Sequence, residues 1–332
     1  MAGGCMRYDT VRNQEKESEN MVVKVNNLVK RYGDLIALDH FNLEVREGEV
    51  FGLLGPNGSG KTTAINCILA LLKYDKGSVE VFGKPMQPDS YEAKRNIGIV
   101  MQNVAVFNEL TVRENISYFC GLYVGDKQKC AGLVEEAICF VGLENFAKFY
   151  PKKLSGGLLR RLNIACGIAH KPKLIILDEP TVAVDPQSRN SILEGILDLN
   201  RQGATVIYTS HYMEEVEHIC SRIAIMDKGK VIASGTTNEL KGMIKTGEKI
   251  TAELLKSETG FLEGLKRLPY VSSAEISGSQ LLIKSEHGKN NLAAVLDYLN
   301  TQHIAYGKIF CELPTLNDVF LEITGKELRD QG

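Results

Sequence analysis

No apolar run in this 332-residue sequence reaches the roughly 18 residues that predict a membrane-spanning helix. The first 20 residues also lack the apolar segment of a secretory signal. We expect residues 1–20 to form a disordered extension, with Met21 as an alternative start. A chain with neither a span nor a signal is expected in the cytoplasm.

Cysteine spacing and charge argue against two further classes of protein. The eight cysteines are scattered without a Cys-x-x-Cys pair, which is typical of reduced thiols in a cytosol. His218 lies beside Cys220, but no cluster of ligands completes a zinc site. The net charge of −2 and a pI near 6.3 give no basic footprint, so no nucleic-acid partner is expected.

The hydrophobic pattern predicts an α/β domain followed by a small α+β domain. Short apolar runs at residues 50–54, 96–100, 173–178 and 205–210 are typical of central parallel strands. Alternating patterns predict half-buried strands at 21–28 and 41–45. Helical spacing of apolar residues predicts helices at 61–72 and 189–203. The pattern of residues 223–235 favours a hairpin at the sheet edge.

The predicted domains follow from where these patterns change. The first domain covers residues 21–240 and contains an α-helical subdomain at about 103–170, where the strand pattern fades. In residues 241–332, strand-like stretches at 249–255 and 279–285 alternate with helical ones at 260–268 and 290–300. We interpret this part as an accessory domain that supports dimerisation or regulation. Thr315 with Asp318 predicts a capped helix start within it.

The sequence GPNGSGKT, from Gly55 to Thr62, follows an apolar strand and opens a helix. This is the context in which the pattern G-x-x-x-x-G-K-T predicts a phosphate-binding loop. Glycines let the backbone N–H groups point at phosphate oxygens, and the helix N-terminus adds positive partial charge. Lys61 supplies a formal charge for the β- and γ-phosphates, and the Thr62 hydroxyl suits Mg²⁺.

Two adjacent acids end the strand at 173–178 and suit phosphoryl chemistry. Asp178, at the carboxyl end, is positioned for Mg²⁺, and Glu179 could polarise an attacking water. A lone Asp-Glu pair is usually a solvated strand end, but a phosphate loop upstream favours the catalytic interpretation. Taken alone, His211 and Gln102 at other strand ends, and Tyr32 before the loop, are more often structural; the Tyr32 ring could stack on adenine.

The stretch LSGGLLRR, from Leu154 to Arg161, leaves two interpretations open. Ser155, Gly156 and Gly157 lead into a predicted helix and could form a second anion cradle. The same chemistry suits an ordinary helix N-cap in a surface turn.

Taken in order, these motifs resemble those of ATP-binding cassette (ABC) transporter ATPase subunits. The resemblance covers about residues 22–235 and includes Tyr32, GPNGSGKT, Gln102, LSGG, LDEP, TVAVDP and SHYMEE. It implies an ABC-type P-loop NTPase fold, with a mixed sheet core and an α-helical subdomain, that binds ATP and Mg²⁺. The expected phosphate-loop contacts are Gly55, Asn57, Gly58, Ser59, Gly60, Lys61, Thr62 and Thr63.

The resemblance also implies a role for each remaining motif residue. Tyr32 matches the adenine-stacking aromatic, and Gln102 matches the glutamine that senses metal and γ-phosphate and links to the membrane partner. Asp178 matches the metal ligand and Glu179 the catalytic base. His211 matches the histidine that contacts the γ-phosphate.

The family assigns Ser155, Gly156 and Gly157 to the signature motif, which binds the γ-phosphate held by the other subunit's phosphate loop. Asp185 matches the loop that crosses between subunits. Two chains, head to tail, would then make two ATP sites, as a homodimer or with a paralogous ATPase. Leu158 stands where the family commonly has glutamine, which puts in doubt any polar contact of that side chain.

One phosphate loop, one signature and no heptad tract favour a transport subunit over other ABC ATPases. The motif wording and the tail PTLNDVFLEITG are similar to bacterial drug and antibiotic exporter subunits, which pair with a separate membrane permease. Such a subunit is expected on the cytoplasmic face of the membrane. The alternative is a soluble ABC ATPase that acts on a ribosome or nucleic-acid complex.

Overall fold

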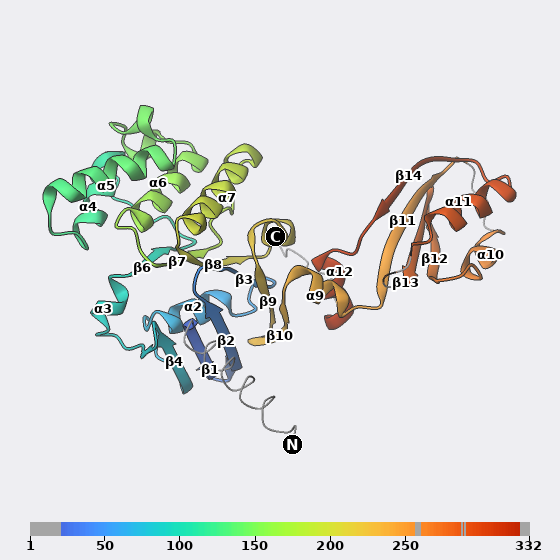
Figure 1. Ribbon diagram of the computed structural model, residues 1–332, viewed down its shortest axis with the longest axis horizontal. Coiled ribbons are helices and arrows are strands. Elements are labelled where there is room, and N and C mark those ends of the chain that lie inside the picture. The colour runs from blue at the N-terminus through green and yellow to red at the C-terminus, as the bar shows by residue number, and fades with distance from the viewer. Residues whose placement is uncertain (1–20, 256–259, 287, 289, 326–332) are drawn as a thin grey trace, which may run out of the picture. The chain divides into compact units, whose positions relative to one another are not determined.

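The computed structural model describes residues 21–255, 260–286, 288 and 290–325 (Figure 1). The predicted extension at residues 1–20 lies outside them. The described residues divide into two compact units, residues 21–234 and 235–325. Within them, no helix combines the length and the apolar character that a bilayer crossing requires.

A six-stranded sheet forms the centre of the first unit, in the order β10-β9-β3-β8-β7-β6. The five strands from β9 to β6 are parallel, so their carboxyl ends meet at one edge, where ligands bind in such sheets. The strands are β3 (Val50–Leu54), β6 (Ile97–Val100), β7 (Leu174–Asp178), β8 (Thr205–Ser210), β9 (Arg222–Asp227) and β10 (Lys230–Gly235).

The predicted edge hairpin is confirmed as β9 and β10. Its turn residues Lys228 and Gly229 both have positive φ, 46° and 80°, as the tight turns that join twisted strands require.

A second sheet of four strands has the order β2-β1-β4-β5. Its strands are β1 (Met21–Tyr32), β2 (Leu35–Arg46), β4 (Lys76–Val81) and β5 (Lys84–Pro85). One apolar core joins this sheet, helix α2 (Lys61–Ile68) and one face of the six-stranded sheet. The sequence predicts α2 to run to residue 72, but it ends at Ile68, because Ala70 has a φ of +50° that no α-helix continues through. The short helix α3 (Tyr91–Lys94) precedes β6.

Between β6 and β7 the chain forms a helical region, which Figure 1 shows in green. It contains α4 (Val112–Gly121), α5 (Lys127–Phe140), η1 (Glu144–Phe146), η2 (Pro151–Lys153) and α6 (Gly156–Ile168). Thr111 begins α4 with a capping box to Glu114. Helix α6 then returns to the sheet, where a Cβ on Gly98 of β6 would lie 2.4 Å from the Gly167 carbonyl oxygen. Glycine at this position therefore lets α6 rest directly on the strand.

Two helices complete the first unit. Helix α7 (Pro186–Arg201) joins β7 to β8, and Gly203, with φ of +99°, follows its end as predicted. Helix α8 (Met213–Ile219) joins β8 to β9. It packs against β3 at Gly52, where a Cβ would meet Val216 at 2.7 Å.

The second unit is a four-stranded antiparallel sheet in the order β12-β13-β11-β14. Its elements are α9 (Thr237–Gly242), β11 (Thr246–Leu254), α10 (Leu262–Lys266), β12 (Val271–Ser277), β13 (Gln280–Glu286), α11 (Leu292–Thr301), β14 (Tyr306–Glu312) and α12 (Leu316–Thr324). From β11 to β14, the β-α-β-β-α-β order and this strand order give a ferredoxin-like arrangement. Helices α10 and α11 pack on the same face of the sheet.

The two strands predicted here are confirmed as β11 and β13, and the sheet contains two further strands, β12 and β14. The sequence pattern misses β14, because this edge strand is mostly exposed, and β12, because three of its seven residues are serine. The predicted start of α12 is confirmed: Thr315 and Asp318 form a reciprocal capping box.

The contact between Gly98 and α6 yields a stability prediction. Gly98→Ala should lower the free energy of unfolding by about 1–3 kcal/mol, because the added methyl group overpacks a site that cannot yield. Gly132 in α5 is the matched control, since a Cβ there meets nothing within 4 Å. Gly132→Ala should raise stability by about 0.5–1 kcal/mol through helix propensity. Urea unfolding measures the free energy of unfolding of both variants. Equal changes in the two variants would show that the close approach of α6 to Gly98 does not matter for stability.

Candidate functional site

The loop from Gly55 to Thr62 connects β3 to α2 and can be built only with glycine at key positions. A Cβ on Gly55 would lie 2.3 Å from the Met226 carbonyl oxygen. Gly60 has φ of +105°, and a Cβ there would lie 2.6 Å from the Ala37 carbonyl oxygen. The loop backbone is therefore held tightly between β9 and β2, with the N-terminus of α2 at its end.

A cavity of about 570 Å³ opens beside this loop, a size typical of small-molecule sites. The Tyr32 side chain, 49% exposed, stands at its wall. The cavity brings together nine of the predicted residues: Tyr32, Asn57, Gly58, Gly60, Lys61, Thr62, Thr63, Gln102 and Glu179. Leu35, Ile36, Ala37, Lys228 and Gly229 complete the lining.

The four predicted catalytic side chains meet at the Glu179 carboxylate, which is buried. Lys61 Nζ lies 3.1 Å and His211 Nδ1 lies 3.4 Å from Glu179 Oε1. Gln102 Nε2 donates to Oε2 at 3.2 Å. Lys61 also donates to the Gly55 carbonyl at 2.8 Å. A buried carboxylate is tolerated only when charge and hydrogen bonds compensate it, and these three partners supply both.

Asp178 lies fully buried at the end of β7. Thr62 Oγ1 donates to Asp178 Oδ2 at 2.9 Å, and Thr209 Oγ1 donates to Asp178 Oδ1 at 2.5 Å. A hydroxyl and a carboxylate are the hard oxygen ligands that Mg²⁺ prefers. Because Gln102 donates through its amide nitrogen, its amide oxygen is left for a cation. The side chains present therefore fit a magnesium ion.

The backbone of Glu179 is strained, with φ of +48° in the left-handed region. Both of its backbone polar atoms are anchored. The N–H donates to Thr209 Oγ1 at 3.0 Å, and Arg160 Nη2 donates to the carbonyl at 3.0 Å. Arg160 also donates through Nη1 to the Met101 carbonyl at 3.0 Å. One guanidinium from α6 thus joins the end of β6 to the acidic end of β7.

Sequence reasoning missed both anchoring residues. Thr209 lies in a strand that is buried at every position. Only its place two residues before His211 indicates a role in the site. Arg160 lies about one helical turn after the signature residue Gly157. It is buried, but no local sequence pattern distinguishes a buried arginine at this position from an exposed one.

The signature residues and Asp185 lie outside the cavity and close to one another. Ser155 is the N-cap of α6 and accepts from the Leu158 N–H at 3.3 Å, so the cap interpretation holds. A Cβ on Gly157 would lie 2.5 Å from Ser188 Oγ and 3.1 Å from Asp185 Oδ2. Asp185 caps α7, and hydrogen bonds from Ser188 hold the pKa of its exposed carboxyl below the ordinary value.

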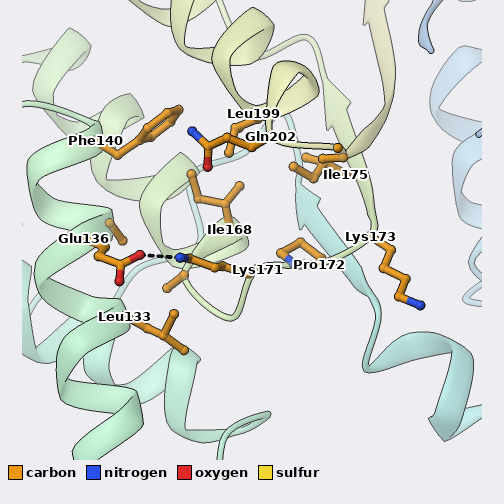
Figure 2. A pocket seen from close by; sticks show the side chains of 14 residues that line it. Leu133, Glu136, Phe140, Ile168, Lys171, Pro172, Lys173, Ile175, Leu199 and Gln202 are labelled. Carbon is orange, nitrogen blue, oxygen red and sulfur yellow. Dashed lines mark ion pairs between the residues drawn. The ribbon is translucent and has the colours of Figure 1, made fainter. Parts of the chain in front are cut away.

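A separate cleft of about 340 Å³ lies between α5, the α6–β7 connection and the end of α7 (Figure 2). Its lining is largely apolar, and an ion pair between Glu136 and Lys171 crosses its rim. No residue that the sequence predicted as functional lines this cleft.

A glycine-built phosphate loop, an acidic strand end and a buried glutamate around one cavity define a P-loop ATPase site. The model of the ABC transporter family matches residues 38–182. The chain is 38% identical to the linearmycin resistance ATP-binding protein LnrL of Bacillus subtilis, over 93% of this chain and all of that protein. It is 32% identical to the Nod factor export ATP-binding protein I of Sinorhizobium fredii, over 98% and 93% of the two chains.

Among solved structures, the chain resembles the dimeric post-hydrolysis state of the ATP-binding cassette MJ0796 bound to ADP and Pi. The TM-score is 0.59 at 29% identity, over 64% of this chain and 98% of that one. The chain belongs to the ABC transporter family, as an ATP-binding ATPase subunit. The predicted family, fold class and enzyme class are thereby confirmed.

The bridge made by Arg160 yields the second prediction. Arg160→Met leaves two carbonyls without their charged donor, so the free energy of unfolding should fall by about 2–4 kcal/mol. ATP turnover should fall at least about tenfold if Glu179 is the general base that the sequence predicts, because such a base must be held in place. Arg201→Met removes an exposed arginine that pairs with Asp198, and should cost less than about 1 kcal/mol. Urea unfolding measures the change in stability, and phosphate release measures turnover. Unchanged turnover in Arg160→Met would show that Arg160 is not needed to position Glu179.

Proposed function

We propose that two copies of this chain bind two MgATP head to tail and power export through a separate membrane permease. The observation that carries the proposal is the separation of the two halves of the site within one chain. Lys61 lines the cavity, whereas Ser155, Gly156 and Gly157 lie outside it, beside Asp185. The signature of one copy would close over the phosphate loop of the other.

In this proposal, each predicted residue has a chemical task. Lys61 and the loop N–H groups stabilise negative charge on the β- and γ-phosphates. Glu179 accepts a proton from the attacking water, and His211 and Gln102 hold that carboxylate in place. Mg²⁺, held by Thr62, Asp178 and Gln102, would neutralise charge on the phosphate oxygens. The exposed ring of Tyr32 would stack on adenine.

The permease is proposed to dock on the aromatic surface that follows Gln102 along the chain. Phe107, Tyr118, Phe149 and Tyr150 are each more than 40% exposed, and the rings of Phe107 and Tyr118 meet edge to face, with centroids 4.9 Å apart. Exposed aromatic residues are enriched at protein interfaces. Docking there would place the chain at the cytoplasmic face of the membrane and would let ATP-driven closure act on the permease.

Export is proposed because of the relatives. Their names describe linearmycin resistance and Nod factor export, and the chain aligns with each over nearly its whole length. The transported substrate would be set by the permease.

Replacing the base tests this function. Glu179→Gln should keep ATP binding, because the phosphate loop is intact, and should trap an ATP-bound dimer that sediments at twice the monomer mass. Turnover should fall by about 10²–10⁴, as loss of a general base does. Glu136→Gln, a change to an exposed carboxylate, is the matched control and should behave as wild type. Wild-type turnover in Glu179→Gln would overturn the assignment of the base.

The same trapped variant distinguishes a transport subunit from the alternative, a soluble ABC ATPase that acts on a ribosome or nucleic-acid complex. Purified from cells, it should carry an integral membrane protein with it. Recovery of ribosomes or DNA in place of a membrane protein would contradict the transport function.

A further inference from the structure

A second buried carboxylate, Glu215 of α8, lies outside the catalytic cluster. It is 4% exposed, and three hydroxyl groups converge on one of its oxygens. Oε2 accepts from Tyr208 at 2.6 Å, from Thr181 at 2.9 Å and from Ser210 at 3.0 Å. Burial and the neighbouring Glu215 charge raise the pKa of Tyr208 well above its ordinary value, so that hydroxyl remains a donor.

The network fixes both neighbours of His211. Ser210 precedes the histidine and donates to Glu215, and it also accepts from the Tyr212 N–H at 2.9 Å. Arg189 Nε lies 3.4 Å from Glu215 Oε1, and its guanidinium lies 4.9 Å from the centre of the Tyr212 ring. The Tyr212 ring in turn packs on His211, with centroids 4.1 Å apart. The position of the His211 ring therefore depends on the Glu215 carboxylate.

The same carboxylate holds the segment that carries Asp185. Thr181 begins this turn, and its carbonyl accepts from the Val184 N–H at 3.2 Å. Asp185 caps α7, and Arg189 lies in the first turn of that helix. Two contacts, from Thr181 and Arg189, thus join Glu215 to both ends of the segment 181–189.

A buried charge costs stability unless every partner is in place. Apolar side chains of similar volume would hold α8 on the sheet without that cost. The network is therefore better explained by the geometry that it imposes than by stability. It links two segments that meet different partners: residues 208–212 face Glu179, and residues 181–189 face the signature turn.

We propose that Glu215 is a positioning residue that couples the Asp185 segment to His211. This inference rests on the proposed head-to-tail dimer, in which Asp185 faces the other copy. Docking of that copy would move residues 181–189, and the shared carboxylate would transmit the movement to the histidine beside the base. Glu215 does not line the cavity beside the phosphate loop; it acts through His211.

The test compares Glu215→Gln and Glu215→Ala with Glu214→Gln, a change to the exposed neighbour on the same helix. Gln keeps an acceptor for the hydroxyls but loses the charge that faces Arg189. We expect kcat to fall about fivefold for Gln and about thirtyfold for Ala, with the KM for ATP within about twofold of wild type. Glu214→Gln should leave both constants unchanged.

A double-mutant cycle with His211→Ala separates positioning from a structural role. If Glu215 acts through His211, its replacement should lower kcat by less than about twofold in the His211→Ala background. Independent, multiplied losses would overturn the proposal. Amide exchange provides a readout without turnover and also covers the case in which the Ala variant folds poorly. In Glu215→Gln, exchange should rise in both 181–185 and 209–213, and a rise in neither or in only one would contradict the coupling.

Failure of the inference and failure of the proposed function give different results. If the wild type turns over MgATP as a dimer while the Glu215 variants match it, only the coupling is wrong. If the wild type neither dimerises on MgATP nor releases phosphate, the proposed function is wrong, and the coupling fails with it.

Discussion

The site depends on one constraint: the buried carboxylate of Glu179, directly after β7, has to be held in place. Glu179 has a left-handed backbone conformation, which costs about 1–3 kcal/mol unless the surroundings enforce it. The surroundings enforce it from both sides, through Thr209 at the N–H and Arg160 at the carbonyl. The side chain then meets Lys61, Gln102 and His211. Removing any of these contacts leaves buried charge or backbone uncompensated.

The fold holds Glu179 in place because strands and helices of the first unit approach one another closely. The carboxyl ends of the parallel strands put Asp178, Glu179 and His211 at one edge of the sheet. Gly98 lets α6 rest on β6, so that Arg160 can reach the carbonyls of Met101 and Glu179. The helix that has Ser155 as its N-cap therefore also holds the backbone of Glu179 through Arg160 in its second turn.

Much of the site could be predicted from the sequence, because its chemistry lies in contiguous motifs. The phosphate loop requires a strand, glycines and a helix start in one short stretch, and Asp178 with Glu179 ends an apolar strand. Thr209, Arg160 and Glu215 could not be found in this way. Each is a single polar residue whose importance arises from neighbours distant in sequence, so no local periodicity marks it. How Ser155 and Asp185 act is a prediction of another kind, since it depends on a second copy of the chain.

The fold was predicted where the strands are buried at every position, as in β3, β7 and β8. Strands β14 and β12 were missed because burial gives a weaker pattern there: β14 is an exposed edge strand, and β12 carries small polar residues. The end of α2 was missed for another reason, because the left-handed Ala70 ends the helix within an unbroken apolar run.

The claim that each ATP site is shared between two copies is tested most directly by mixing two inactive variants. Lys61→Ala removes the phosphate-loop charge, and Ser155→Arg blocks the signature turn, so each variant alone should be nearly inactive. In a head-to-tail heterodimer, one of the two sites has an intact Lys61 from one copy and an intact Ser155 from the other. An equimolar mixture should therefore recover about a quarter of wild-type phosphate release, since half of the dimers are mixed and each has one intact site. A mixture as inactive as its components would contradict the shared site.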